Sequence, residues 1–253
     1  MRDKYPLFEH DYNSTAITEP SKIYKNVRNI PERAVLVFYQ KVIDDLLAKD
    51  LLEKIDALTS ETGIFPIYRL KEKNITVMNS GLGAPFSGAA LEELIVRGVN
   101  MCIACGSAGV LNKNFERGSI VVVSSAVRDE GTSYHYLKPS REVQVENETV
   151  KIIEGVLDKS GVPYTTGKTW TTDAIYRETK EIIRKRISEG CITVEMKSSA
   201  LIAISKFRNI KFGQILSCGD DVSGEEWDKR VHPEAHTHKE KLFWLAVDCC
   251  QAF

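Results

Sequence analysis

The chain has 253 residues, of which 43% are hydrophobic, and its 34 basic and 35 acidic residues give a formal net charge of −1. This length and composition suffice for a substantial core, and we expect a single domain over residues 1–253. The near-zero charge argues against nucleic acid or an anionic membrane as a partner, and it favours a small molecule that is recognised locally.

The opening residues are charged and lack the apolar core of a signal peptide, and no later run is long enough to span a bilayer. The six cysteines lie mostly inside apolar segments, without the spacing of a disulfide-stapled secreted domain. We therefore expect a cytoplasmic protein with reduced thiols and no association with membranes.

Short apolar runs bounded by Gly, Asn or Pro predict buried strands at AVLVFY, NITVMNSG, MCIACGSAG and SIVVVSSAV. Helical periodicity predicts helices over residues 42–58, 85–97, 149–159, 178–188, 196–207 and 233–250. The alternation predicts an α/β fold, a three-layer sandwich with a central mixed β-sheet flanked by helices. Ligands of such sheets collect at the carboxyl ends of strands, which is where candidate site residues are sought.

Two small-residue turns follow predicted strands. Gly81 and Gly83 precede a helix that begins near Pro85, and Ser107 lies in the turn GSAG. Glycine lets backbone N–H groups approach an oxyanion, a helix N-terminus adds partial positive charge, and a serine hydroxyl can donate to it. These turns are candidate phosphate sites, although tight turns that only pack strands closely would have the same sequence.

The stretch TVEMKSS places Glu195, Met196 and Lys197 between the strand CITV and a helix. A carboxylate there can accept hydrogen bonds from sugar hydroxyls while a thioether packs on the apolar face of the sugar. The alternative is structural, with Glu195 complementing the helix dipole and Met196 filling the core.

Two adjacent carboxyl groups, Asp220 and Asp221, close the predicted strand FGQILSCG. A partly buried carboxyl with a raised pKa can protonate a leaving group, and we prefer Asp220, with Asp221 as the fallback. Either aspartate could instead cap a turn. His232, His236 and His238 include one pair at helical spacing, but no recognised metal-binding pattern is complete, and we expect no metal.

Taken in order, these motifs resemble those of the nucleoside phosphorylase family, which includes purine nucleoside phosphorylases, uridine phosphorylases and methylthioadenosine nucleosidases. SGLGAPFSG resembles the first phosphate loop, GSAGVLNKNFERGSIVVVSSAVRDEGTSYHY the most diagnostic run, TTDAIYRE the base-pocket loop and VEM the ribose clamp. The resemblance implies that Glu195, Met196 and Lys197 lie at the ribose, and Thr172, Tyr176 and Arg177 at the base.

The chain departs from the family pattern at three positions. Lys197 stands where a second acidic residue usually binds the 2′-hydroxyl, and an ammonium group cannot accept a hydrogen bond. Ala104 stands where the phosphorylases generally carry an arginine, and Lys22 falls at the position of the N-terminal phosphate arginine. Lys197 either reaches toward the phosphate in place of that arginine or points to solvent.

The resemblance predicts phosphorolysis of a purine or uridine nucleoside to free base and ribose 1-phosphate, with inorganic phosphate as co-substrate and no other cofactor. It also implies a homo-oligomer, either a dimer or a hexamer built from dimers. A hydrolase of the methylthioadenosine or S-adenosylhomocysteine nucleosidase type, or a nucleoside-binding homologue without turnover, remains the alternative.

Overall fold

The computed structural model describes residues 5–9, 11–24, 30–231 and 235–253. In that part of the chain ten strands form one mixed sheet in the order β10-β6-β8-β9-β5-β1-β4-β3-β2, with β7 paired to β6. The strands are β1 Arg33–Val37, β2 Leu52–Ser60, β3 Gly63–Leu70, β4 Ile75–Met78, β5 Met101–Val110, β6 Ile120–Asp129, β7 Glu142–Gln144, β8 Tyr164–Thr172, β9 Cys191–Glu195 and β10 Lys211–Asp221.

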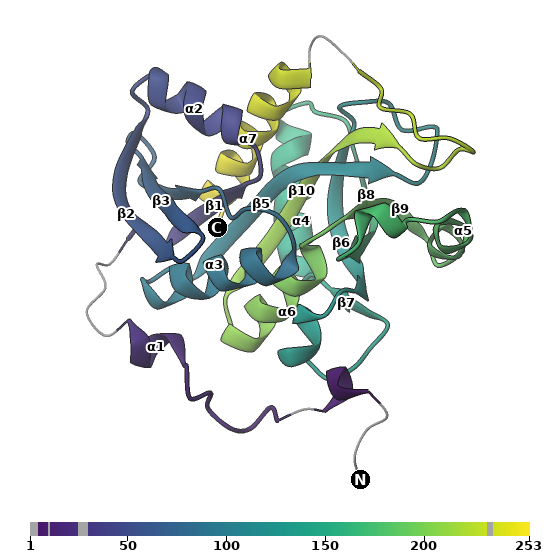
Figure 1. The fold of residues 1–253 in the computed structure, drawn as a ribbon. Coiled ribbons are helices and arrows are strands. Elements are labelled where there is room, and N and C mark those ends of the chain that lie inside the picture. The colour runs from purple at the N-terminus through teal and green to yellow at the C-terminus, as the bar shows by residue number, and fades with distance from the viewer. Residues whose placement is uncertain (1–4, 10, 25–29, 232–234) are drawn as a thin grey trace.

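Helices cover both faces of this sheet. The helices are α1 Pro20–Ile23, α2 Gln40–Ala48, α3 Ala84–Val96, α4 Asn147–Lys159, α5 Lys180–Ser188, α6 Ser198–Arg208 and α7 Ala235–Gln251, with 3₁₀ turns η1 Pro6–Phe8, η2 Thr132–His135 and η3 Ile175–Arg177. Figure 1 shows α3 and α6 in front of the sheet and α4 and α7 behind it. The predicted fold class, a central mixed sheet between helices, is confirmed.

The long strand β5 belongs to two parts of the sheet. Its first half pairs in parallel with β1, and its last residues pair in antiparallel fashion with β9. Because β10 pairs with both β5 and β6, the strands β5, β10, β6, β8 and β9 close into a ring. This closure brings the end of β9 against the end of β5, which positions the candidate site.

The predicted helix over residues 42–58 is wrong in its second half. Helix α2 ends before Asp50, whose φ of 57° is left-handed, and the following residues form β2 in a hairpin with β3. The buried side chains of Leu52, Ile55 and Leu58 recur every three residues, which imitates a helix. A register shift in the middle of β2 lets a strand bury this pattern instead.

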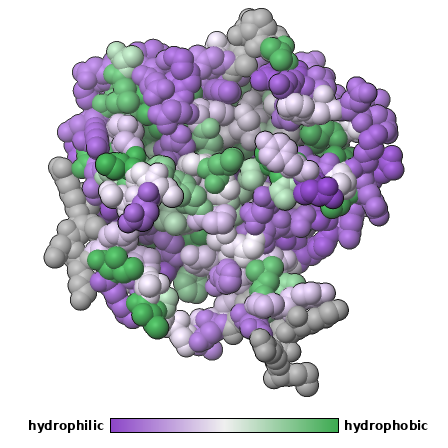
Figure 2. Space-filling model, in the orientation of Figure 1, coloured by the Kyte–Doolittle hydropathy of each residue, from purple (hydrophilic) through white to green (hydrophobic). Residues whose placement is uncertain are grey.

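The remaining predicted helices lie within two residues of those observed. The threonine-rich strand β8 and the hairpin strand β3, which contains a proline, were not predicted. In Figure 2 hydrophilic residues cover most of the visible face, with hydrophobic residues in separate spots. Among the described helices, none combines the length and apolar character that crossing a membrane requires.

Candidate functional site

The antiparallel register between β5 and β9 assembles the predicted site. Gly109 pairs with Val194, so the residues after Val194 run back along β5. Lys197 contacts the Phe38 ring, and that ring lies against Gly106 of β5, which agrees with this direction. The end of the predicted ribose clamp therefore lies near the residue before Ser107.

The predicted turn at GSAG is wrong, because β5 runs without a break from Met101 to Val110 and includes these residues. Ser107 is an exposed residue of this strand. Its Oγ lies 3.0 Å from the hydroxyl of Tyr39, which follows β1 and is only 7% exposed. Burial raises the pKa of Tyr39 well above its ordinary value, so that side chain stays a neutral hydroxyl. Tyr39 was not singled out from the sequence, although the aromatic pair that ends AVLVFY is a visible signal.

The first glycine turn has a conformation that demands glycine. Gly81 has a φ of 66°, and a Cβ there would lie 2.5 Å from the ring of Phe86. Its backbone N–H already donates to Asn79 Oδ1 at 3.0 Å. Gly83, with a φ of 85°, is the N-cap of α3. The part of this turn that is open to an anion is thus the helix end, and the phosphate role of both glycines stays a prediction.

The carboxylate of Glu195 caps α6. One oxygen accepts a hydrogen bond from Thr171 Oγ1 at 2.7 Å, and the other accepts from the backbone N–H groups of Lys197 and Ser198 at 2.6 and 2.9 Å. The side chain is 5% exposed and uses three of its roughly four acceptor positions. The structural alternative for Glu195 is therefore present, and a direct contact with sugar stays a prediction. Met196 is half-buried, so it is more accessible to a sugar than Glu195 is.

Lys197 does not point to solvent, so that alternative is wrong. Lys197 is 6% exposed, and its Nζ lies 4.3 Å from the centroid of the Phe38 ring. The Phe38 ring in turn lies against Gly106, where a Cβ would be 2.8 Å from it. Burial lowers the pKa of Lys197, while the negative charge of Glu195 opposes this shift.

The two adjacent aspartates have different surroundings. Asp220 accepts a hydrogen bond from the Trp227 indole N–H at 2.7 Å, and its other oxygen lies 3.8 Å from the Cβ position over Gly109. Asp221 accepts from the Ser223 N–H at 2.8 Å and forms an ion pair with Arg230.

These surroundings also separate the two aspartates chemically. Burial opposes ionisation of Asp221, but the bonds from Ser223 and Arg230 outweigh burial and lower its pKa. A carboxylate held ionised in this way has no proton to deliver near neutral pH. The structure therefore disagrees with Asp221 as the fallback donor and leaves Asp220 as the candidate.

Glu178, the last residue of the motif TTDAIYRE, was not singled out from the sequence. Its side chain is half-buried beside the end of β10. Burial and then the negative charge of Asp220 raise the pKa of Glu178 to about 7. A carboxyl group that is partly protonated near neutral pH thus lies beside the candidate donor, which is the pattern expected of acid–base sites.

The predicted base-binding residues do not come together. Thr172 is buried at the end of β8, and its Oγ1 accepts from the N–H of Ala174 at 3.2 Å. Tyr176 is 93% exposed, and Arg177 is also exposed on η3. In this single chain only Thr172 faces the interior, and the base-binding role of all three stays a prediction.

Lys22 lies on the short helix α1, which packs along α3. Its ammonium group donates to the carbonyl of Ala16 at 3.3 Å. Among the described residues the structure shows no contact between Lys22 and Ser107, so its phosphate role also stays a prediction.

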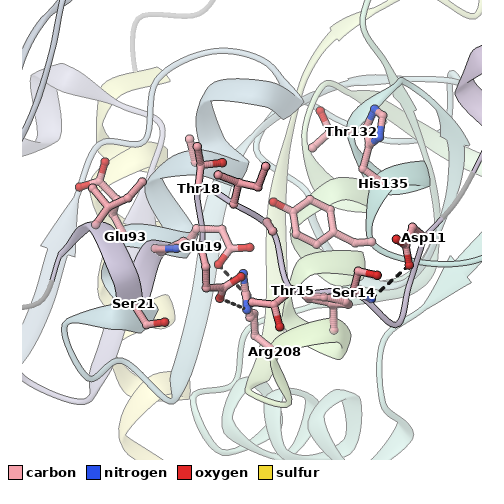
Figure 3. A pocket seen from close by; sticks show the side chains of 18 of the residues that line it. Asp11, Ser14, Thr15, Thr18, Glu19, Ser21, Glu93, Thr132, His135 and Arg208 are labelled. Carbon is pink, nitrogen blue, oxygen red and sulfur yellow. Dashed lines mark hydrogen bonds and ion pairs between the residues drawn. The ribbon is translucent and has the colours of Figure 1, made fainter.

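A cavity of 1330 Å³ lies away from these residues, between the N-terminal arm, defined here as residues 11–24, and the elements α3, η2 and α6. Arg208 bridges two carboxylates there, that of Glu19 at 2.6 Å and that of Glu92 at 2.8 Å. Figure 3 shows Arg208 beside Glu19. Carboxylates outnumber cations in its lining, and none of the predicted site residues lines it. The cavity therefore does not suit phosphate, and its ion pairs attach the N-terminal arm to α6 and α3.

Within the described part of the chain, no group of three or more His, Cys, Asp or Glu side chains is placed to hold a metal ion. His236 of α7 instead bonds Asp45 of α2. His232 lies outside the described residues.

Comparisons with known proteins identify the family of the chain. A guanosine phosphorylase from Halorubrum lacusprofundi is 25% identical over 184 residues, which are 71% of this chain and 76% of that protein. Solved structures of similar fold include a purine nucleoside phosphorylase from Toxoplasma gondii, with a TM-score of 0.75, 20% identity and coverage of 88% and 91% of the two chains. An AMP nucleosidase from Bacteroides thetaiotaomicron superposes with a TM-score of 0.71 at 18% identity, covering 88% of each chain. A family model described as the phosphorylase superfamily matches residues 32–246, and the chain therefore belongs to that superfamily.

Proposed function

We propose that the protein is a nucleoside phosphorylase that cleaves the N-glycosidic bond of a purine or uridine nucleoside with phosphate, giving free base and ribose 1-phosphate. Membership of the superfamily and the similarity to a guanosine phosphorylase support this reaction class. The geometry of β5 supports the assignment of roles.

One observation carries the proposal. Ser107 and Gly109 are two residues apart, so their side-chain positions share one face of β5 at a spacing of about 7 Å. Ser107 presents a hydroxyl on this face, and the space over Gly109 is bordered by Val194, Val222 and one carboxylate oxygen of Asp220. The Ser107 hydroxyl and the Asp220 carboxylate thus border the same face of β5, about two residues apart along the strand.

The chemistry follows from this spacing. Phosphate held at Ser107 forms a bond from its oxygen to C1′ of the ribose, while the bond from C1′ to the base nitrogen breaks and its electron pair leaves with the base. Positive charge develops on the sugar in such transition states, and the phosphate anion stabilises it. A proton delivered to N7 of a purine neutralises the departing base, with Asp220 as the candidate donor and Glu178, whose pKa is raised to about 7, as a further acid near it.

A hydrolase is the second candidate, because Ala104 is fully buried in β5 and offers no cation to phosphate. The fold similarity to an AMP nucleosidase is compatible with this alternative. Water would then attack C1′, and base release would not depend on phosphate.

The test is to incubate the protein with inosine, guanosine, uridine and adenosine, with and without phosphate, and to identify both products by chromatography. We expect base release that requires phosphate and is accompanied by ribose 1-phosphate. Equal release without phosphate, with free ribose as the second product, would establish the hydrolase instead. A protein that binds nucleosides without cleaving any of them would be a non-catalytic homologue.

A further inference from the structure

Lys197 differs from the other buried cations of the described chain. Arg97, Arg128 and Arg186 are between 4% and 6% exposed, and each donates hydrogen bonds to carboxylates, hydroxyls or carbonyl oxygens. Lys197 is equally buried at 6%, but the structure gives its ammonium group only the face of the Phe38 ring. A buried charge without a hydrogen-bonding partner is costly, and proteins usually pair it.

The nearest carboxylate along the chain does not supply that partner. Glu195 accepts hydrogen bonds from Thr171 and from two backbone N–H groups, one of them that of Lys197 itself. Its negative charge acts on the ammonium group, but no ion pair joins the two side chains among the described contacts. Ser198, the next residue, is 0% exposed, and its hydroxyl also has no hydrogen-bond partner in the described structure.

The ammonium group of Lys197 lies near the part of β5 that carries Ser107, the predicted anion-binding residue. Phe38 contacts Lys197 on one side and Gly106 on the other, and its own N–H donates to the Cys105 carbonyl at 3.2 Å, which fixes it to β5. The residue after Phe38 is Tyr39, whose hydroxyl bonds Ser107. Phe38 and Tyr39, which are adjacent in the chain, thus connect Lys197 and Ser107 to consecutive residues of β5.

We propose that Lys197 is an anion-binding residue that, with Ser107, holds a phosphoryl group against the sugar. The inference rests on the proposed function and narrows its substrate class. The phosphoryl group comes from one of two sources, inorganic phosphate as co-substrate or a phosphate ester on the ribose of a nucleotide. Lysine binds phosphate as a point charge, and the hydroxyls supply the directional donors.

The pKa of Lys197 gives phosphoryl binding a second readout. Burial lowers the pKa of Lys197, and a bound dianion acts in the opposite direction. Phosphoryl binding should therefore favour the protonated amine and take up protons at alkaline pH, an effect that an exposed lysine would not show.

The test measures binding without turnover, by calorimetric titration of the protein with inorganic phosphate, adenosine and the 2′-, 3′- and 5′-monophosphates of adenosine. The variant is Lys197→Met, with Lys206→Met as the matched control, because Lys206 is exposed on the same helix. Lys197→Arg keeps the charge and should recover part of the binding. Circular dichroism verifies that each variant is folded.

We expect Lys197→Met to weaken phosphoryl binding at least tenfold while adenosine binding changes less than twofold. Loss confined to inorganic phosphate identifies the co-substrate, and loss confined to one monophosphate identifies a nucleotide substrate. Unchanged binding of all phosphoryl ligands, or an equal loss in Lys206→Met, would overturn the inference. Because no catalysis is measured, this outcome is separate from failure of the proposed reaction, which shows as an absence of base release.

Discussion

Two regions of the molecule hold buried cations in opposite ways. Beside β6 and β8, Arg186 of α5 donates to Asp129 at 2.7 Å and to Glu189 at 3.2 Å, and the Trp170 indole N–H donates to the same Asp129 carboxylate at 2.9 Å. At the start of α6, Lys197 has no carboxylate partner among the described residues.

The difference separates residues that serve stability from residues that await a ligand. The Arg186 cluster has its counter-charges within the chain, so its removal should cost stability and leave chemistry intact. Lys197 lacks the hydrogen-bonded partners that the buried arginines of the described chain have, and proteins accept such departures mainly at functional sites. Substitutions there should change activity far more than folding.

The largest expected effect is on catalysis, at Asp220. Asp220→Asn keeps a hydrogen-bond acceptor for Trp227 but cannot release a proton, so kcat/KM for purine nucleosides should fall about 10²–10⁴-fold. Substrate binding should change little, because the loss falls mainly in the transition state. Steady-state kinetics with inosine and phosphate measure the effect, and Asp158→Asn on the exposed side of α4 is the control. A loss of folding in Asp220→Asn would instead assign Asp220 to the stability group.

Glu195 lies between the two groups, because it caps a helix within the candidate site. Glu195→Gln replaces a charged acceptor of three hydrogen bonds with an amide, and we expect the free energy of unfolding to fall by about 1.5–3 kcal/mol. Urea denaturation measures this change, with Glu148→Gln in the exposed first turn of α4 as the control. If Glu195 also binds sugar, nucleoside affinity will fall more than affinity for the free base. Equal weakening of both ligands would restrict Glu195 to its capping role.

The third prediction compares how the two buried cations, Arg186 and Lys197, affect the free energy of unfolding. Arg186→Met removes hydrogen bonds to charged partners and should lower the free energy of unfolding by about 1.5 kcal/mol, since Asp129 is partly exposed and can be rehydrated. Lys197→Met removes an unpaired buried charge and should raise it by about 1 kcal/mol in the absence of ligand. Thermal denaturation of both variants in buffer free of phosphate compares the signs. The same sign in both would show that the two regions do not differ as described.

Local sequence patterns predicted much of this fold. The features that they did not predict depend on strand register between residues far apart in the chain. The helix and strand alternation and the turn at Gly81 are visible in the sequence, because they depend on residues adjacent in the chain. The predicted turn at Ser107 is wrong, because small residues that read as a turn continue strand β5. The interior position of Lys197 depends on the antiparallel pairing of β9 with β5, which no local pattern specifies. The hairpin strand β2 was missed for a related reason, since its register shift gave a strand the spacing of a helix.

The raised pKa of Glu178 also depends on a residue far away in the sequence. It leads to the smallest of the predicted effects. Burial and the charge of Asp220, far along the chain, raise that pKa to about 7, so the Glu178 proton is present at pH 6 and largely absent at pH 8. If this proton goes to the leaving base, kcat/KM should decline above pH 7, by roughly tenfold for each pH unit beyond it. Glu178→Gln should flatten that alkaline limb while lowering the plateau.

The stability of the folded protein should also depend on the titration of Glu178, and it should fall as the pH rises. Because the pKa of Glu178 is higher in the folded protein than its ordinary value of 4.5, the folded state binds the proton more tightly than the unfolded state does. This contribution is fully present below pH 4.5 and is lost as the pH rises to about 7. The carboxyl is only partly buried, so the change should be small. Thermal melting of the protein and of Glu178→Gln between pH 4.5 and 8 isolates it by difference. A midpoint that falls less with pH in the variant is expected, and identical profiles would place Glu178 outside the acid pair.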